Sequence, residues 1–209
     1  MFVVGLTGGV ASGKTTIAYI LREEGAYVID ADQIARELVQ PDTPVWNEIV
    51  KVFGREILEK DGSIGRKKLA AMVFSDPQQR GLLNRILHPR IKEEMDRRLE
   101  EVSQRHPEDI VVVDAALLVE TGDYRKMDKL IVVTSTETQQ IERLRQRDGM
   151  EPERAREILS SQMALEEKLK VADFVIRNDG SFEETERRVK EVFQELKKIA
   201  LQKRAEKKS

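Results

Sequence analysis

A glycine-rich run near the N-terminus has the residue types and spacing of a phosphate-binding loop. The segment from Gly8 to Thr15, GGVASGKT, matches the pattern G-x-x-x-x-G-K-[ST] at every fixed position. Glycines permit close backbone approach, so that N–H groups and the start of the next helix can point at phosphate oxygens. Lys14 is expected to reach the β- and γ-phosphates, and the Thr15 hydroxyl to bind Mg²⁺. A plain glycine-rich turn is the alternative, but the flanking strand and helix patterns favour binding of a nucleoside triphosphate.

Motifs of the other phosphate-loop proteins narrow the reaction class. The sequence has no N/T-K-x-D segment to read guanine, and no Asp is followed by Gly three residues later, as a GTP switch usually requires. The segment LSSQ at 159–162 matches a transporter-type LSGGQ poorly, and 209 residues are few for a motor or remodelling ATPase. We therefore expect a small kinase that uses Mg²⁺ with ATP as co-substrate.

Three aspartates lie where expected strands end. Asp30 and Asp32 flank Ala31 after the apolar run 27–29, and Asp114 follows the β-branched run 110–113. On a strand, residues two apart point the same way, so both carboxylates could face one substrate. We expect Asp32 to be the general base for an attacking hydroxyl, while Asp30 either joins it or caps a helix. Asp114 is expected either to face Mg²⁺, directly or through water, or to accept hydrogen bonds behind it.

Arginines are concentrated in the segment 137–168, which has a helical pattern interrupted near Gly149 and Pro152. They are Arg143, Arg145, Arg147, Arg154 and Arg156. Arg143 and Arg147 are four residues apart and so share a helix face. A kinase must exclude water, and arginines that close over the site also neutralise charge on the transferred phosphoryl group. We interpret this segment as a lid, although any one arginine could instead form a solvated pair, such as Arg145 with Glu142.

Five short apolar runs alternate with helical patterns, which predicts an α/β fold with a parallel, doubly wound sheet. The expected strands are 2–6, 27–29, 110–113, 130–133 and 174–176. Thr136 with Gln139, and Ser181 with Glu184, have the spacing of helix capping boxes. Pro77 suits the first turn of a helix capped by Ser75 or Asp76.

The chain is expected to form one domain of 209 residues with three parts. The nucleotide-binding core comprises about 1–30, 107–136 and 169–202, and the lid comprises about 137–168. The helical stretch of about 31–106 is too long for one crossover and is interpreted as an acceptor-binding insertion. Trp46 and Phe53 have the spacing of core residues within that insertion.

Composition excludes several classes of function. A net charge of −2 provides no basic excess for coating a nucleic acid, so no nucleic-acid partner is expected. The absence of cysteine removes disulfides and thiolate metal sites. No apolar run approaches the ~18 residues that span a membrane, and no leader is evident, so we expect a cytoplasmic location without membrane or obligate protein partners.

Several motifs in order resemble those of the dephospho-CoA kinase family across nearly the whole chain. The first two are GLTGGVASGKTT at 5–16, and VIDAD at 28–32 followed by Ile34, Ala35 and Arg36. The next two are Leu87-His88-Pro89 with Ile91, and DAALLVE at 114–120. The last are the lid residues Gln140, Arg143, Arg147, Ala155, Arg156 and Gln162, and the closing segments 172–173, 175–176 and 178–180. Ala116 stands where the family usually has proline, which leaves the shape of that turn open.

The resemblance implies a P-loop kinase fold and transfer of the ATP γ-phosphoryl group to the ribose 3′-hydroxyl of dephospho-CoA. It implies Asp32, Lys14 and Arg143 as catalytic residues. The implied ATP-binding residues are Gly9, Ala11, Ser12, Gly13, Lys14, Thr15, Thr16, Arg147, Asn178 and Gly180. The implied acceptor-binding residues are Asp32, Arg36, His88, Leu117 and Glu120, and the metal-binding residues are Thr15 and Asp114.

Two alternatives remain beside this resemblance. One is another small-molecule kinase, acting on a nucleoside monophosphate or a sugar acid. The other is an ATP-binding regulatory module without catalysis, against which the intact Lys14, Thr15, Asp32 and lid arginines count.

Overall fold

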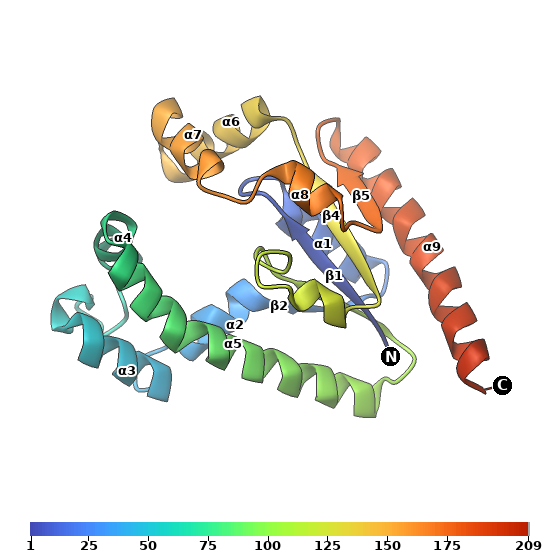
Figure 1. Ribbon diagram of the computed structural model, residues 1–209, viewed down its shortest axis with the longest axis horizontal. Coiled ribbons are helices and arrows are strands. Elements are labelled where there is room, and N and C mark those ends of the chain that lie inside the picture. Colours follow the sequence, from blue (N-terminus) through green and yellow to red (C-terminus); the bar gives the residue numbers. More distant parts are fainter. Residues whose placement is uncertain (209) are drawn as a thin grey trace. The chain divides into compact units, whose positions relative to one another are not determined.

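The computed structural model describes residues 1–208, and the side chains of all of these except 74, 75, 207 and 208 (Figure 1). The strands are β1 (Phe2–Gly8), β2 (Tyr27–Asp30), β3 (Ile110–Asp114), β4 (Lys129–Thr134) and β5 (Phe174–Arg177). The helices are α1 (Lys14–Glu23), α2 (Ala31–Leu38), α3 (Pro44–Phe53), α4 (Arg66–Ser75), α5 (Pro77–Arg105), α6 (Glu137–Asp148), α7 (Pro152–Ser160), α8 (Leu165–Leu169) and α9 (Phe182–Lys208). Two 3₁₀ turns are η1 (Arg55–Ile57) and η2 (Asp123–Lys126).

The five strands form one sheet in the order β2-β3-β1-β4-β5, so β1 is central. β1 pairs in parallel with β3 and β4, and β4 in parallel with β5. Because Leu6 lies beside both Asp114 and Ile131, the carboxyl ends of the three middle strands meet at one edge. In such sheets ligands bind beyond that edge. The predicted parallel α/β sheet is confirmed.

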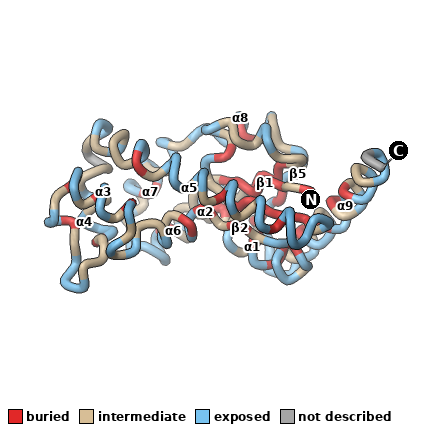
Figure 2. Tube along the Cα trace, turned by 90° about the horizontal axis from the view of Figure 1, so that it is seen from below, coloured by how far each residue is buried: buried red, intermediate tan, exposed pale blue. Residues whose placement is uncertain are grey.

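Helices α1 and α9 pack together and cover one face of the sheet. Alternate strand residues such as Val4, Val112 and Val133 join Ile17 of α1 and Phe193 of α9 in a single buried cluster. Figure 2 shows the buried residues gathered around β1. This arrangement follows from the period of two along each strand and the apolar stripes on both helices. It fixes the start of α1 directly behind the glycine-rich loop.

The chain forms two compact units, Met1–Ile29 with His106–Ser209, and Asp30–Arg105. The second unit has its own core, in which Val45, Ile49 and Phe53 of α3 pack with Ile57 and Ile86. Trp46 is not in that core, contrary to its prediction. Its one-residue offset from Val45 turns it to the helix flank, where it is half-buried and its Nε1 donates to the Gly62 carbonyl.

Capping residues set the helix boundaries at the positions predicted from sequence. Asp76, one of the two predicted caps, accepts hydrogen bonds from the N–H groups of Gln78 and Gln79 at the start of α5. Thr136 and Gln139 form the capping box of α6. Gly149 then ends α6 in a left-handed conformation with φ 67°, and α7 begins at Pro152.

A helix that crosses a bilayer needs about 20 mostly apolar residues. Within the part of the chain that the structure describes, no helix is both long enough and apolar enough to do so.

Candidate active site

The glycine-rich loop joins β1 to α1 and has two residues in left-handed backbone conformations. These are Ala11 with φ 56° and Gly13 with φ 91°. A Cβ atom at position 13 would lie 1.8 Å from Nδ2 of Asn178, so only glycine fits. Helix α1 starts at Lys14, and the first N–H groups of a helix have no acceptor within it. The loop therefore presents backbone donors and a positive helix end to an anion.

Side chains from the lid and from the end of β5 hold the backbone of this loop. Gln140 Nε2 donates to the Val10 carbonyl, and Arg143 Nη1 donates to the Ala11 carbonyl, at 2.8 and 3.1 Å. Asn178 Nδ2 donates to the Ser12 carbonyl at 2.9 Å. Three successive loop carbonyls are thus turned toward protein donors.

A second group of contacts ties these side chains to one another. Arg143 Nη2 donates to the Asn178 carbonyl at 2.9 Å, and Thr185 Oγ1 donates to Asn178 Oδ1 at 3.1 Å. Gln162 Oε1 accepts from the Val10 N–H at 2.8 Å. The sequence marked Gln140 and Gln162 only as part of the lid pattern, whereas the structure has both of them on Val10.

Lys14 and Asp114 form an ion pair at the edge of the sheet where β1 and β3 end. The Lys14 side chain is 13% exposed and that of Asp114 is 4% exposed. Removing either partner of so buried a pair would be strongly destabilising, because the other charge would be left buried and unpaired. The carboxylate that was expected near Mg²⁺ therefore lies beside the lysine that was expected to reach the phosphates.

The donor atoms near this pair suit Mg²⁺ that arrives with a nucleotide. Thr15 is exposed at the start of α1 and offers a hydroxyl, while Asp114 offers a carboxylate. Among the described residues there is no cluster of three or more His, Cys, Asp or Glu side chains that could hold a metal by themselves. Oxygen donors in small number fit Mg²⁺, which usually keeps waters and takes phosphate oxygens as ligands.

The two aspartates at the junction of β2 and α2 differ from their predicted geometry. Asp30 caps α2, because its carboxylate accepts from the Gln33 N–H at 2.9 Å, and its Oδ2 lies 3.8 Å from Arg36 Nη2. The cap starts the helix at once, so Asp32 lies exposed in the first turn of α2 rather than on a strand. The expectation that both carboxylates point the same way along a strand was wrong.

The remaining predicted acceptor residues are solvent-accessible. His88 is exposed on α5, next to Pro89 inside that helix, and Arg36 is half exposed on α2. Leu117, in the turn after β3, is 45% exposed. Glu120 belongs to the same turn, but its Oε1 is paired with Lys168 Nζ at 2.7 Å. Sequence reasoning missed Lys168, because nothing in its spacing marks it as buried.

The lid arginines separate into two kinds. Arg143 reaches the loop, whereas Arg147 pairs with its neighbour Asp148 at 2.7 Å and has a 62% exposed side chain. The hydrogen bonds that Arg147 donates raise its own pKa and lower the pKa of Asp148. The other three form solvated pairs, in which Arg145 meets Glu142, Arg154 meets Glu157 and Arg156 meets Glu153. Of these five arginines, Arg143 is the one with a described hydrogen bond to the loop that would bind phosphate.

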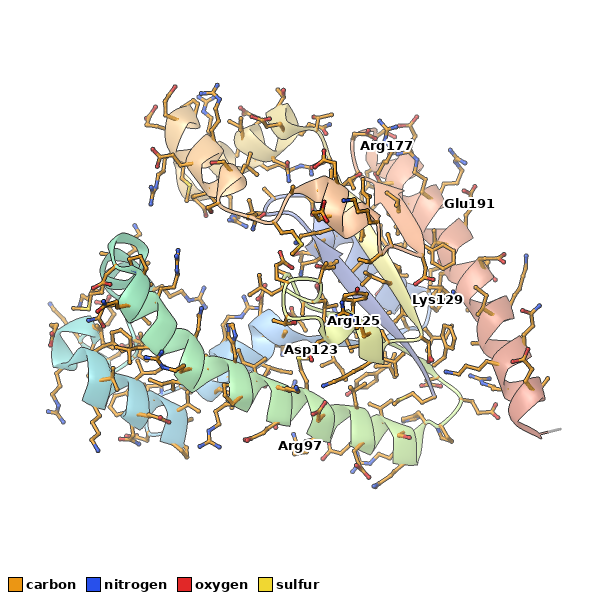
Figure 3. All side chains as sticks on the ribbon, viewed as in Figure 1. Arg97, Asp123, Arg125, Lys129, Arg177 and Glu191 are labelled. Carbon is orange, nitrogen blue, oxygen red and sulfur yellow. The ribbon has the colours of Figure 1, made fainter. Side chains whose placement is uncertain are left out.

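Hydrogen bonds and ion pairs order the segment between β5 and α9, which includes the predicted ATP-binding residue Gly180. Arg177, labelled in Figure 3, donates to the carboxylate of Asp179, and Arg188 adds a contact at 3.3 Å. The Arg177 hydrogen bonds hold the pKa of Asp179 below its usual range. Gly180 follows, and Ser181 with Glu184 forms the second predicted capping contact at the start of α9.

A cavity of about 570 Å³ lies beside the loop within the same unit. Its wall includes Gly9 of the loop, Ser135 after β4, Gln140 of α6, Arg156 of α7 and Lys168 of α8. The cavity lies between the segment 137–168 and the carboxyl end of the sheet, and it opens to solvent. A kinase must shield its reacting groups from water at this edge of the sheet.

A parallel sheet with this loop, a buried lysine–aspartate pair and an arginine-rich helical segment over residues 137–168 is typical of a P-loop kinase. Comparison with known proteins narrows the class: residues 2–184 match the sequence model described as dephospho-CoA kinase, and the chain belongs to that family. It is 43% identical over 196 residues to a dephospho-CoA kinase of Corynebacterium glutamicum, covering 94% of this chain and 100% of that one.

Solved structures agree with the family match. A crystal structure of a Thermus thermophilus protein superposes with a TM-score of 0.76 at 32% identity, covering 93% of this chain and 97% of that one. The dephospho-CoA kinase of Campylobacter jejuni gives a TM-score of 0.64 at 28% identity, covering 93% and 96%. The resemblance inferred from separate motifs is therefore confirmed at the level of the family.

Proposed function

We propose that this chain transfers the γ-phosphoryl group of ATP to the ribose 3′-hydroxyl of dephospho-CoA, giving coenzyme A and ADP. The family match over residues 2–184 is the observation that carries the proposal. The intact phosphate loop with its Lys14–Asp114 pair supports it, since a binding module without catalysis would not need both.

The phosphate loop supplies positioning and charge. Backbone N–H groups at the start of α1 and the Lys14 ammonium would hold the β- and γ-phosphates, and Arg143 would add a second cation from the lid. The hydrogen bond from Arg143 to the Ala11 carbonyl supports this role, because it holds the guanidinium at the loop. Stabilisation of this kind needs little reorganisation at the moment of transfer.

Mg²⁺ would be held by the Thr15 hydroxyl and, directly or through water, by Asp114. When bound, the ion neutralises charge on the phosphate oxygens. Because Asp114 is already paired with Lys14, one carboxylate would serve both the lysine and the metal. The Asp114 side chain would thereby hold both the Lys14 ammonium and Mg²⁺ close to the same phosphates.

Asp32 would accept the proton of the attacking ribose hydroxyl. A new bond then forms between that oxygen and the γ-phosphorus, while the bond to the bridging β,γ-oxygen breaks and ADP leaves. An exposed carboxylate in the first turn of α2 is free to meet a solvent-borne substrate. The acceptor would also be held by Arg36, His88, Leu117 and Glu120. ATP would also be bound by Arg147, Asn178 and Gly180.

The test is a coupled assay of ADP release with Mg·ATP, in which dephospho-CoA is compared with AMP, CMP, adenosine and no acceptor. We expect fast turnover with dephospho-CoA alone. Turnover with a different acceptor would support kinase activity but refute dephospho-CoA as the substrate. ATP binding without turnover on any of these acceptors would instead indicate a regulatory module.

The proposed cellular setting follows from the substrates. Both are water-soluble nucleotides of the cell interior, so we propose a cytoplasmic enzyme that needs no membrane, nucleic acid or obligate protein partner. Fractionation of cells that express the chain, with the activity recovered in the cytosol, is the corresponding test.

A further inference from the structure

Lys168 is a buried lysine that the mechanism above does not use. It lies in α8, at the end of the segment 137–168, and its side chain is only 2% exposed. Lysine is almost never fully buried unless it is paired, because an ammonium loses its hydration there. The partners of a buried lysine therefore have to compensate for its lost hydration.

Both contacts of Lys168 fall on the turn that follows Asp114. Lys168 Nζ lies 2.7 Å from Oε1 of Glu120 and donates to the Ala116 carbonyl at 3.3 Å. The same carbonyl accepts from Thr7 Oγ1 of β1 at 2.9 Å. The turn 115–121 is thus anchored from β1 on one side and from α8 on the other.

This anchoring decides which side chains the turn presents. Leu118 is 2% exposed and packs inward, whereas its neighbour Leu117 is 45% exposed. The turn also follows immediately on Asp114, whose carboxylate is paired with Lys14. A shift of the turn would therefore move Leu117, a candidate acceptor contact.

We propose that Lys168 is a positioning residue for the acceptor: it fixes the turn 115–121 and links that turn to the end of the lid. The proposal rests on the proposed function, because the acceptor is the substrate whose binding should respond. Lys168 also lines the cavity beside the phosphate loop, so one side chain both borders that cavity and holds the turn.

The matched variants are Lys168→Met and Lys170→Met. Methionine has a similar length without the charge, and Lys170 lies two residues further on with a 66% exposed side chain paired to Glu167. We expect Lys168→Met to raise the KM for dephospho-CoA about tenfold and to change the KM for Mg·ATP less than about twofold. Lys170→Met should match the unmodified chain in both constants.

Thr7→Val provides a second variant in case Lys168→Met does not fold. It removes the other hydrogen bond to the Ala116 carbonyl while keeping the shape of the side chain. The KM for dephospho-CoA should rise again, by a smaller factor. A rise in neither variant, or an equal rise of both KM values, would overturn the positioning role.

Hydrogen exchange separates this proposal from the proposed function. Amides of the turn 115–121 should exchange faster in Lys168→Met than in Lys170→Met, whatever substrate the enzyme uses. If the unmodified chain fails to turn over dephospho-CoA, the proposed function is refuted. The hydrogen-exchange rates of the turn 115–121 then remain as the test of whether Lys168 anchors it. If the unmodified chain is active and exchange in the turn is the same in both variants, the positioning proposal is refuted.

Discussion

Replacing Gly13 with alanine should destabilise the protein through two separable effects. The first is backbone strain, because φ is 91° and a side chain in that region costs about 1 to 2 kcal/mol. The second is a collision, because the new Cβ would lie 1.8 Å from Asn178 Nδ2. Moving that amide breaks its bond to the Ser12 carbonyl, and an unsatisfied buried polar group costs about 1 to 3 kcal/mol. We expect a total loss of about 2 to 5 kcal/mol.

Gly25→Ala is the matched control for the strain. Gly25 has φ 101°, and nothing lies within 4 Å of the Cβ that would be added there. This variant should therefore lose only the ~1 to 2 kcal/mol of backbone strain. The excess in Gly13→Ala measures the collision with the Asn178 side chain.

The assay is urea unfolding of the two variants and of a double-mutant cycle with Asn178→Ala. In the Asn178→Ala background the collision is gone, so Gly13→Ala should cost no more than Gly25→Ala does. The coupling free energy should then be at least ~1 kcal/mol. Equal losses for Gly13→Ala and Gly25→Ala in the unmodified chain would refute the contact between the loop and Asn178.

Three further predictions concern charge. Asp32→Asn should lower kcat about 10²- to 10⁴-fold with the KM for Mg·ATP nearly unchanged, and a parallel loss of both would remove the assignment of a general base. Arg143→Ala should cost about 10²- to 10³-fold in kcat/KM by the coupled assay, whereas Arg145→Ala, on the same helix but in a solvated pair, should cost little. Hydrogen bonds from Arg97 lower the pKa of Glu94 from 4.5 to about 2, so this carboxylate adds stability above pH 4.5 that is lost as pH falls toward 2. Glu94→Gln should therefore remove about 1 kcal/mol at neutral pH and flatten the acid side of the unfolding curve; an unchanged slope would contradict it.

Local sequence signals predicted the elements of the fold well. The capping pairs Thr136–Gln139 and Ser181–Glu184 each span three residues, so the spacing alone marks them in the sequence. The β-branched run in β3 is buried along its whole length, as a strand covered on both faces must be. These features depend on neighbours in sequence and could be inferred from it.

Side-chain partners that are distant in sequence could not be inferred in the same way. Lys168 and Glu120 meet only because α8 packs over the sheet, and periodicity carries no signal for that contact. Asn178 meets Ser12 because the strand order brings the carboxyl ends of β1 and β5 to the same edge of the sheet. Asp32 was misplaced for a local reason. The pattern around it fits either the end of a strand or a capped helix, and the hydrogen bond from the Gln33 N–H to Asp30 selects the helix.

The most direct test of the account is the identity and position of the phosphate added to dephospho-CoA. The purified chain would be incubated with Mg·ATP and dephospho-CoA, and the product analysed by mass spectrometry and phosphorus NMR. We predict one added phosphate, on the ribose 3′-oxygen, with ADP formed in equal amount. ADP formed without a phosphorylated acceptor, or a phosphate at another position, would contradict the account.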